Sequence, residues 1–192
     1  MESEMLLAVA ETVPETRGSG AVLVGYGAVA ELTRFAADPA WSVHVPGHPA
    51  EVRRTILDAV RGGGRAYVQV SAESNAEPRE AAERFQLVRE GRAGVVLAVG
   101  AALDPVLRAT ADLDVSVLYG ATIRPFDEIG LRTAVLAADH ADVVLVEPGL
   151  PGTSARQVAD TLVHVPHRLC ALGGTDGLDE QALARIVRGF LR

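Results

Sequence analysis

Two glycines near the N-terminus could take part in nucleotide binding. Residues 25–30 (GYGAVA) have the pattern G-x-G-x-x-A and follow the apolar run AVLV. In dinucleotide-binding proteins such glycines let a pyrophosphate approach the N-terminus of the next helix. That arrangement also needs an acidic residue at the end of the next strand, where this chain has Pro46 and Gly47. A tight turn between strand and helix accounts for Gly25 and Gly27 more simply, and cofactor binding by them is kept as an alternative.

Histidine and cysteine side chains could bind a metal ion or act as nucleophiles. His44 and His48 are four residues apart and His164 and His167 are three apart, but each pair straddles a strand end and a proline. The imidazoles therefore need not converge, and we predict no metal site. Cys170 lies inside the apolar run LCAL, where an inert buried thiol is expected. Without a G-x-S-x-G, P-loop or H-E-x-x-H motif, the residues taken alone predict no catalytic group.

The elements that must position these residues can be read from apolar runs that alternate with helical patterns. Such runs are typical of parallel sheets covered by helices on both faces. The expected strands are Gly20–Tyr26, Trp41–Val45, Ala66–Ser71, Ala93–Val99, Val115–Tyr119, Asp142–Glu147 and Leu169–Leu172. Between them, Pro49 is placed to begin a helix, and Asp127 and Asp179 are placed to cap two others. The sequence therefore predicts an α/β fold.

A polar segment divides the chain into two parts. Residues 72–83 (AESNAEPREAAE) are small or charged and include Pro78, as is typical of a linker. We expect a first region over 1–75, a linker over 76–84 and a second domain over 85–192. The second domain should have a mostly parallel sheet with one antiparallel edge strand. The first region is short for an independent domain with both sheet faces covered.

Composition excludes several classes of protein. Of the 192 residues, 48% are hydrophobic and 22% are charged, so the chain can bury a sizeable core. The net charge of −7 and the aromatic content of 4% argue against nucleic-acid binding. Every apolar run is shorter than the ~18 residues that a membrane helix needs, and the acidic N-terminus is unlike a secretory signal. We expect a cytoplasmic protein that binds neither nucleic acid nor membranes.

Three stretches, in this order, resemble the transketolase family of thiamine-diphosphate enzymes. Trp41–Asn75 is similar to the end of the family's pyrimidine-binding domain, where a strand, a proline and a helix with the pattern x-E-v precede another strand and a loop. Val115–Leu131 (VSVLYGATIRPFDEIGL) resembles the start of the C-terminal domain, and Val143–Leu162 (VVLVEPGLPGTSARQVADTL) resembles its glutamate- and glycine-containing segment. The resemblance implies a transketolase C-terminal-like domain preceded by a shortened pyrimidine-domain remnant.

The resemblance also implies that most of the family's cofactor site has no counterpart here. No segment matches the half of the pyrimidine domain that carries the glutamate acting on the aminopyrimidine, or the domain that binds the diphosphate and its metal. We therefore expect no catalytic residue and no cofactor bound by the chain alone, with thiamine diphosphate and magnesium held only through a partner. Glu147 matches a family glutamate for which we expect a structural or interface role.

The loop after the strand Ala66–Val70 is where family members place arginines that bind a substrate phosphate. Here the loop has no arginine or lysine, and neutral or acidic side chains cannot replace a guanidinium against a dianion. Ser71 and Asn75 remain as candidate substrate-binding residues.

These observations lead to three hypotheses. The first is a truncated transketolase-like protein, non-catalytic alone, that supports a thiamine-diphosphate-dependent partner as a subunit or interaction module. The second is a functional subunit of a two-component transketolase that transfers ketol groups between sugar phosphates or related ketoses. The third is a nucleotide-binding module that uses Gly25 and Gly27. A homo-oligomer or a complex with a complementary subunit is expected, because the short first region would leave apolar surface uncovered.

Overall fold

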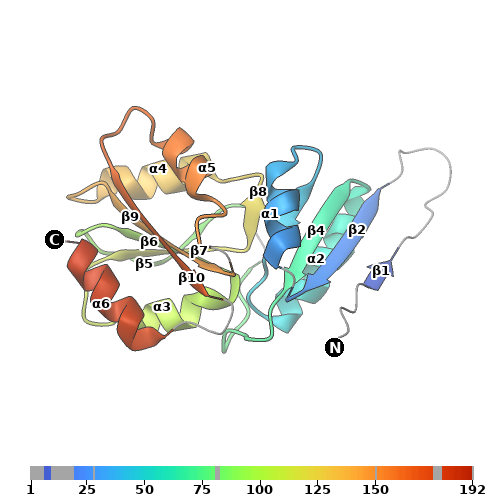
Figure 1. Cartoon of the computed structure of the whole chain (residues 1–192), viewed down its shortest axis with the longest axis horizontal. Helices are drawn as coiled ribbons and strands as arrows, with labels where there is room; N and C mark the ends of the chain where they lie inside the picture. Colours follow the sequence, from blue (N-terminus) through green and yellow to red (C-terminus); the bar gives the residue numbers. More distant parts are fainter. Residues whose placement is uncertain are drawn as a thin grey trace.

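The chain folds into two five-stranded sheets with helices around them (Figure 1). The computed structural model describes residues 7–9, 20–27, 29–80, 83–149, 151–174 and 179–191. In chain order the elements are β1 (Leu7–Val9), β2 (Ala21–Tyr26), α1 (Val29–Ala37), β3 (Ser42–His44), α2 (Pro49–Gly62), β4 (Arg65–Val70), β5 (Gln86–Arg89), β6 (Val95–Val99), a 3-10 turn η1 (Gly100–Ala102), α3 (Leu103–Ala109), β7 (Ser116–Gly120), β8 (Thr122–Arg124), α4 (Glu128–Ala137), β9 (Asp142–Pro148), α5 (Ala155–Thr161), β10 (Arg168–Gly174) and α6 (Glu180–Phe190). The predicted α/β fold is confirmed.

The second sheet has the strand order β10-β9-β6-β7-β5. Its first four strands are parallel, and β5 pairs antiparallel with β7 at the edge, as predicted. Alternate side chains of each strand enter two separate cores, because successive residues of a strand point to opposite faces. Val95 and Leu97 pack with α4 and α5, whereas Val96 and Ala98 pack with α3 and α6. Two helices therefore cover each face of this sheet (Figure 1).

The first sheet has the order β1-β2-β4-β3-β8, with β2, β4 and β3 parallel. Helix α1 packs on one face, where Leu32 and Ala36 join the core, and α2 packs on the other through Ile56 and Val60. Helix α2 begins at Pro49, as predicted, and ends where Gly63 takes a left-handed conformation with φ of 65°. Of the described helices, only one covers each face of this sheet.

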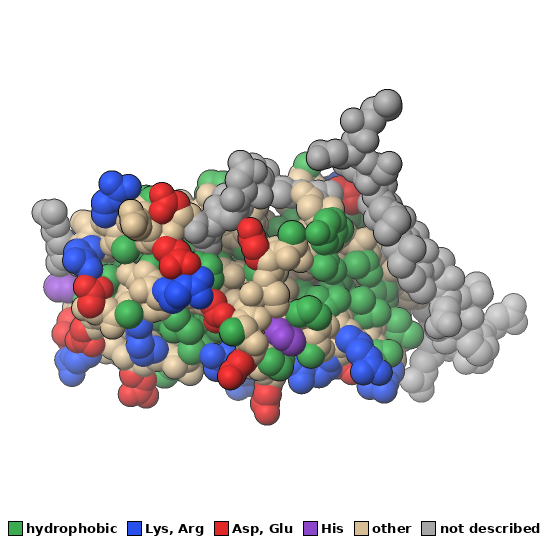
Figure 2. Space-filling model, turned by 90° about the horizontal axis from the view of Figure 1, so that it is seen from below, with side chains coloured by type: hydrophobic (Ala, Val, Ile, Leu, Met, Phe, Trp, Pro, Cys, Tyr) green, Lys and Arg blue, Asp and Glu red, His purple; other side chains and the backbone are tan. Residues whose placement is uncertain are grey.

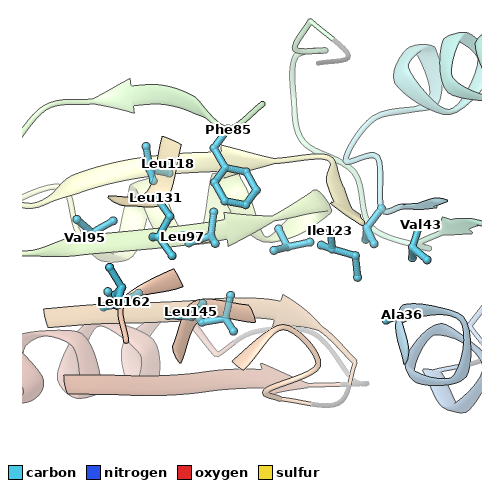
Figure 3. Close-up of a cluster of buried hydrophobic side chains, with 14 of the residues drawn as sticks. Ala36, Val43, Phe85, Val95, Leu97, Leu118, Ile123, Leu131, Leu145 and Leu162 are labelled. Atoms are coloured by element: carbon cyan, nitrogen blue, oxygen red, sulfur yellow. The ribbon is translucent and has the colours of Figure 1, made fainter. Parts of the chain in front are cut away.

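The two sheets share a strand and a core. Strand β8 comes from the segment 85–192, yet it pairs antiparallel with β3 of the first sheet through His44 and Thr122. The largest group of buried side chains also runs through both sheets, from Leu145 to Val43. Ile123 of β8 lies between Leu97 and Val43 in that row (Figure 3). The expected division at residues 76–84 is therefore crossed by a strand and by packed side chains.

The described helices are also short. None of those within the described ranges is long and apolar enough to cross a membrane.

Candidate functional site

A cavity of about 180 Å³ lies at the carboxyl edge of the first sheet. One wall is the turn from β3 into α2, and the other is the end of β4 with the loop after it. Ser71 lines the cavity, directly after the last residue of β4, and Ser74 and Glu73 follow it in the loop. The carboxyl ends of parallel strands commonly hold ligand sites, because the loops there converge. Ser71, predicted as a substrate-binding residue, is thus placed in a cavity of that kind.

His48 faces the same cavity from the start of α2, and it was not among the predicted site residues. Its Nδ1 accepts a hydrogen bond of 3.1 Å from the backbone N–H of Ala50, which makes it the N-cap of the helix. A neutral imidazole that accepts at Nδ1 carries its proton on Nε2, so His48 keeps one N–H donor. The position immediately before the helix-starting Pro49 is the sequence signal that could have identified this capping role.

The cavity contains hydroxyl groups and one carboxylate. Ser71, Ser74 and the imidazole of His48 offer hydrogen bonds, while Glu73 is the one acidic residue of the lining. The described lining includes no arginine or lysine. The arrangement suits an uncharged, hydroxyl-bearing ligand better than a phosphate, which needs cationic partners.

Asn75 is placed differently from Ser71. It is buried, and its side-chain amide donates to the carbonyl oxygen of Gly100 at 3.1 Å and accepts from the backbone N–H of Asp104 at 3.2 Å. Its own N–H donates to the carbonyl oxygen of Gly47 at 2.8 Å. Asn75 thus joins the loop after β4 to the second sheet, and a direct contact with substrate stays a prediction.

Gly47 supports this junction because the space around it is too small for a side chain. A Cβ atom there would lie 2.2 Å from Nδ2 of Asn75 and 2.6 Å from the carbonyl oxygen of Gly100. The backbone N–H of Gly47 points instead to Glu51 and Tyr119, at 3.0 Å from the Oε2 atom of the first and 3.0 Å from the hydroxyl of the second.

Glu51 is a fully buried carboxylate behind the cavity wall. Its Oε2 accepts a hydrogen bond of 2.5 Å from the Tyr119 hydroxyl, and its Oε1 accepts one of 2.7 Å from the backbone N–H of Arg79. Burial raises the pKa of Tyr119, and the neighbouring Glu51 raises it further. The network joins helix α2, strand β7 and the segment that follows β4. It therefore fixes the position of the cavity relative to the second sheet.

The two glycines of the G-x-G pattern have local explanations. A Cβ on Gly25 would lie 2.0 Å from the hydroxyl of Tyr67, which donates a 2.7 Å hydrogen bond to Gln69. Burial raises the pKa of Tyr67 to about 12. Gly27 has a positive φ of 69°, which favours glycine at the turn out of β2. The local backbone thus accounts for both glycines, and cofactor binding by Gly25 and Gly27 stays a prediction.

Glu147 lies at the carboxyl end of β9 in the second sheet and is buried. Its oxygens accept hydrogen bonds from the backbone N–H groups of Gly152 and Ser154, each at 3.1 Å. Burial raises the pKa of Glu147, although these hydrogen bonds oppose the shift. The carboxylate therefore organises the turn before α5, in agreement with the structural role expected from the sequence.

For the described residues, the expectation that thiamine diphosphate is held only through a partner stays a prediction. No three His, Cys, Asp or Glu side chains among them come together as metal ligands. Glu51 is fully buried and does not line the cavity, and its oxygens accept hydrogen bonds from Tyr119, Gly47 and Arg79. We therefore derive no catalytic step from this chain alone.

Comparisons with known proteins support the fold. No known family profile matches this chain. It is 44% identical over 203 residues to the "uncharacterized 33.6 kDa protein in fasciation locus" of Rhodococcoides fascians, covering 90% of this chain and 65% of that protein. A solved structure described as "split gene transketolase, inactive beta4 tetramer" matches 90% of this chain and 67% of its own, with a TM-score of 0.71 and 18% identity. Transketolase from Campylobacter jejuni matches 88% of this chain and 31% of its own, with a TM-score of 0.61 and 15% identity. The chain therefore has a transketolase-like α/β fold, and it spans 65% of the curated relative's length.

Proposed function

We propose that this chain is one subunit of a two-component, transketolase-like enzyme. A partner would hold thiamine diphosphate and its metal, and this chain would supply the cavity wall with Ser71 and His48. The observation that carries the proposal is the match to a split-gene transketolase chain over 90% of this chain, with a TM-score of 0.71. That likeness supports a shared architecture, and the position of the cavity at the open edge of the first sheet supports its use as a substrate-facing wall.

An apolar surface that the described residues leave exposed supports the need for a partner. The first sheet has one described helix on each face, whereas the second has two. Hydrophobic side chains gather on one face of the half that holds the first sheet (Figure 2). Tyr26, at the carboxyl end of β2, is 63% exposed, and Leu57 on α2 is 44% exposed. Large apolar surface of this kind commonly marks a protein–protein contact.

In such an enzyme this chain's residues would bind and orient substrate. The Nε2–H of His48 and the hydroxyl of Ser71 can donate hydrogen bonds to hydroxyl or carbonyl oxygens of a ketose or aldehyde. The Glu51–Tyr119 network would hold these donors in place while substrate binds. The turn that Glu147 organises belongs to the second sheet. It would stabilise the packing of that sheet without contacting substrate.

Two measurements test the proposal. In calorimetry the isolated chain should show no micromolar binding of thiamine diphosphate with Mg²⁺, whereas its complex with a partner that carries the missing domains should bind. A ketol-transfer assay with that partner should lose turnover when this chain is left out. Tyr26→Asp should weaken the complex, and Val163→Asp, at a site 67% exposed outside the first sheet, should not. Unchanged turnover without this chain would reject the proposal.

A further variant separates a functional subunit from a purely supporting one. Ser71→Ala removes one hydroxyl from the cavity lining without removing buried apolar contacts. If Ser71 contacts substrate, the KM of the assembled enzyme should rise severalfold while complex formation is unchanged. Kinetics identical to the unmodified complex would leave this chain with a supporting role only.

A further inference from the structure

A second pocket, of about 350 Å³, lies between helix α2 and the strands β3 and β8. Four residues of α2 line it, spaced as the positions i, i+3, i+4 and i+7 that share one helix face: Thr55, Asp58, Ala59 and Gly62. From the sheet, Ser42 and His44 of β3 and Thr122 of β8 line it. A pocket of this size admits a small organic molecule.

The hydroxyl of Thr55 has no hydrogen-bond partner among the described residues. Thr55 is only 8% exposed, and the helix face that it shares with Asp58 and Gly62 directs its side chain toward the pocket. Two threonines at the ends of other helices, Thr110 and Thr161, donate instead to the carbonyl oxygen four residues earlier, at 2.7 and 2.6 Å. A buried hydroxyl without a partner costs free energy. The Thr55 hydroxyl therefore favours a ligand that pairs with it.

The hydroxyl groups on the sheet side of the pocket have already used their protons. Ser42 donates to the carbonyl oxygen of Arg65 at 3.2 Å, and its oxygen lies 3.1 Å from Nε2 of His44. That ring nitrogen must therefore carry the hydrogen, and Thr122 donates its proton to Nδ1 at 3.0 Å. The oxygens of Ser42 and Thr122 keep lone pairs, so they can accept a hydrogen bond from a ligand and cannot donate one. This side of the pocket favours a ligand with hydrogen-bond donors.

The pocket also carries negative charge. Asp58 and Glu83 both line it, and its described lining includes no arginine or lysine. Asp58 pairs with Arg61 at 3.2 Å, but both side chains are exposed, so this ion pair neutralises the carboxylate only weakly. Burial lowers the pKa of His44, and Glu83 opposes that shift only in part, so the imidazole adds no positive charge at neutral pH. The pocket therefore attracts a cation.

We propose that this pocket binds a small aliphatic primary amine in its protonated form. The ammonium group donates hydrogen bonds to the Thr55 hydroxyl and to the Asp58 carboxylate, and Glu83 adds a second negative charge. Three alanines of the lining contact its carbon chain: Ala59, Ala66 and Ala121. An ammonium group has three N–H donors and no acceptor, which matches a pocket that offers acceptors and negative charge.

The pocket and the cavity of the proposed enzyme share helix α2 but no residue. His48, before the first turn of α2, lines the cavity, whereas Thr55 and Asp58 line the pocket further along the helix. Amine binding is measured on the isolated chain and needs neither a partner subunit nor thiamine diphosphate. The two proposals can therefore fail separately.

An NMR titration of the full chain with butylamine tests the proposal. We expect saturable binding with a Kd below about 1 mM, shifts centred on the amides around Thr55, and an affinity that falls as the salt concentration rises. Butanol has the same carbon chain without the charge, and tetramethylammonium has the charge without N–H donors. Neither should bind in this range.

Four variants assign the binding to this pocket. Thr55→Val deletes the hydroxyl and should raise the Kd about fivefold or more, whereas Thr55→Ser keeps it and should stay within about twofold. Asp58→Asn should raise the Kd about tenfold or more. Asp160→Asn is the matched control, because Asp160 also pairs with an arginine on an exposed helix face, at 3.5 Å from Arg156, and lies outside this pocket. It should leave the Kd unchanged.

Circular dichroism establishes that each variant is folded. The absence of saturable butylamine binding would overturn the proposal. Equal binding of butanol or tetramethylammonium would show that N–H donors do not matter, and would overturn it as well. A Kd that neither T55V nor D58N raises would mean that the net charge of −7 attracts the amine elsewhere on the chain, which would reject this site.

Discussion

Glu51 shows how one side chain can hold a site without facing it. The carboxylate is fully buried, and a buried charge is tolerated only where hydrogen bonds compensate its lost hydration. Tyr119, Gly47 and Arg79 supply those hydrogen bonds from three separate segments. Its partner Tyr119 lies 68 residues further along the chain. The resemblance of its loop to the family indicated Ser71, whose contact with substrate stays a prediction, but the pairing of Glu51 with Tyr119 has no local signal.

Removing one donor from this network should destabilise the protein measurably. Tyr119→Phe keeps the buried ring and deletes the hydroxyl that donates to Oε2 of Glu51. The carboxylate then remains buried with one partner fewer, and we expect the free energy of unfolding to fall by about 1–3 kcal/mol. Urea denaturation measures this change. Tyr26→Phe, at a site 63% exposed, should change it by less than about 0.5 kcal/mol. Equal stabilities of the two variants would show that the network contributes nothing.

At the scale of elements, the buried parallel strands were predictable and the strands at the edges of the first sheet were not. Valine-rich runs such as Asp142–Glu147 are continuous because both faces of the strand are covered, and the structure places β9 over Asp142–Pro148. Strand β8 has three residues, Thr122–Arg124, immediately followed by Pro125. A run so short has no periodicity, and its pairing with β3 depends on the folded arrangement of the whole chain.

The pairing of β3 with β8 places His44 between two hydroxyl groups. Its Nδ1 lies 3.0 Å from the Thr122 hydroxyl and its Nε2 lies 3.1 Å from the Ser42 hydroxyl. Because Ser42 donates its proton to the carbonyl oxygen of Arg65, Nε2 must carry the ring hydrogen and Nδ1 must accept from Thr122. The neutral imidazole therefore fits these partners, and a protonated ring would lose its acceptor.

This arrangement predicts a pH dependence of stability. Burial lowers the pKa of His44 below 6.5, and the negative charge of Glu83 opposes the shift only in part. The unfolded chain then binds a proton at a higher pH than the folded chain does. Stability is therefore full above about pH 6.5 and falls as the pH decreases from there toward the folded pKa. Urea midpoints measured across this range should fall for the unmodified protein.

The matched variants are His44→Gln and His140→Gln. His44→Gln retains a donor and an acceptor without titrating, so its stability should change less over this pH range. His140 is exposed after α4, and its replacement should leave the slope of the unmodified protein. A slope that His44→Gln does not reduce would assign the pH dependence to other groups.

At the scale of the whole molecule, the sequence predicts two separate parts, whereas buried side chains of both sheets form one continuous core. Buried residues of the first sheet and its helix α1, including Val43 and Ala36, belong to the same group as Leu145 and Leu97 of the second sheet (Figure 3). Strand β8 and the Glu51 network add hydrogen bonds across the boundary. Domains with their own cores can unfold separately, but elements that share a core lose their packing together.

The two sheets should therefore unfold in one cooperative step. Trp41, the only tryptophan, packs against Phe35 in the first part at 4.7 Å between ring centroids, so its fluorescence reports on that part. Leu145→Ala creates a cavity in the second sheet and should lower the free energy of unfolding by about 2–5 kcal/mol. If the core is shared, the Trp41 fluorescence midpoint in urea must fall together with the far-ultraviolet circular dichroism midpoint. Leu136→Ala, at a site 64% exposed, should move neither. A Trp41 midpoint that stays fixed while the circular dichroism transition splits would mean that the first part folds independently, with its own core sufficient for stability.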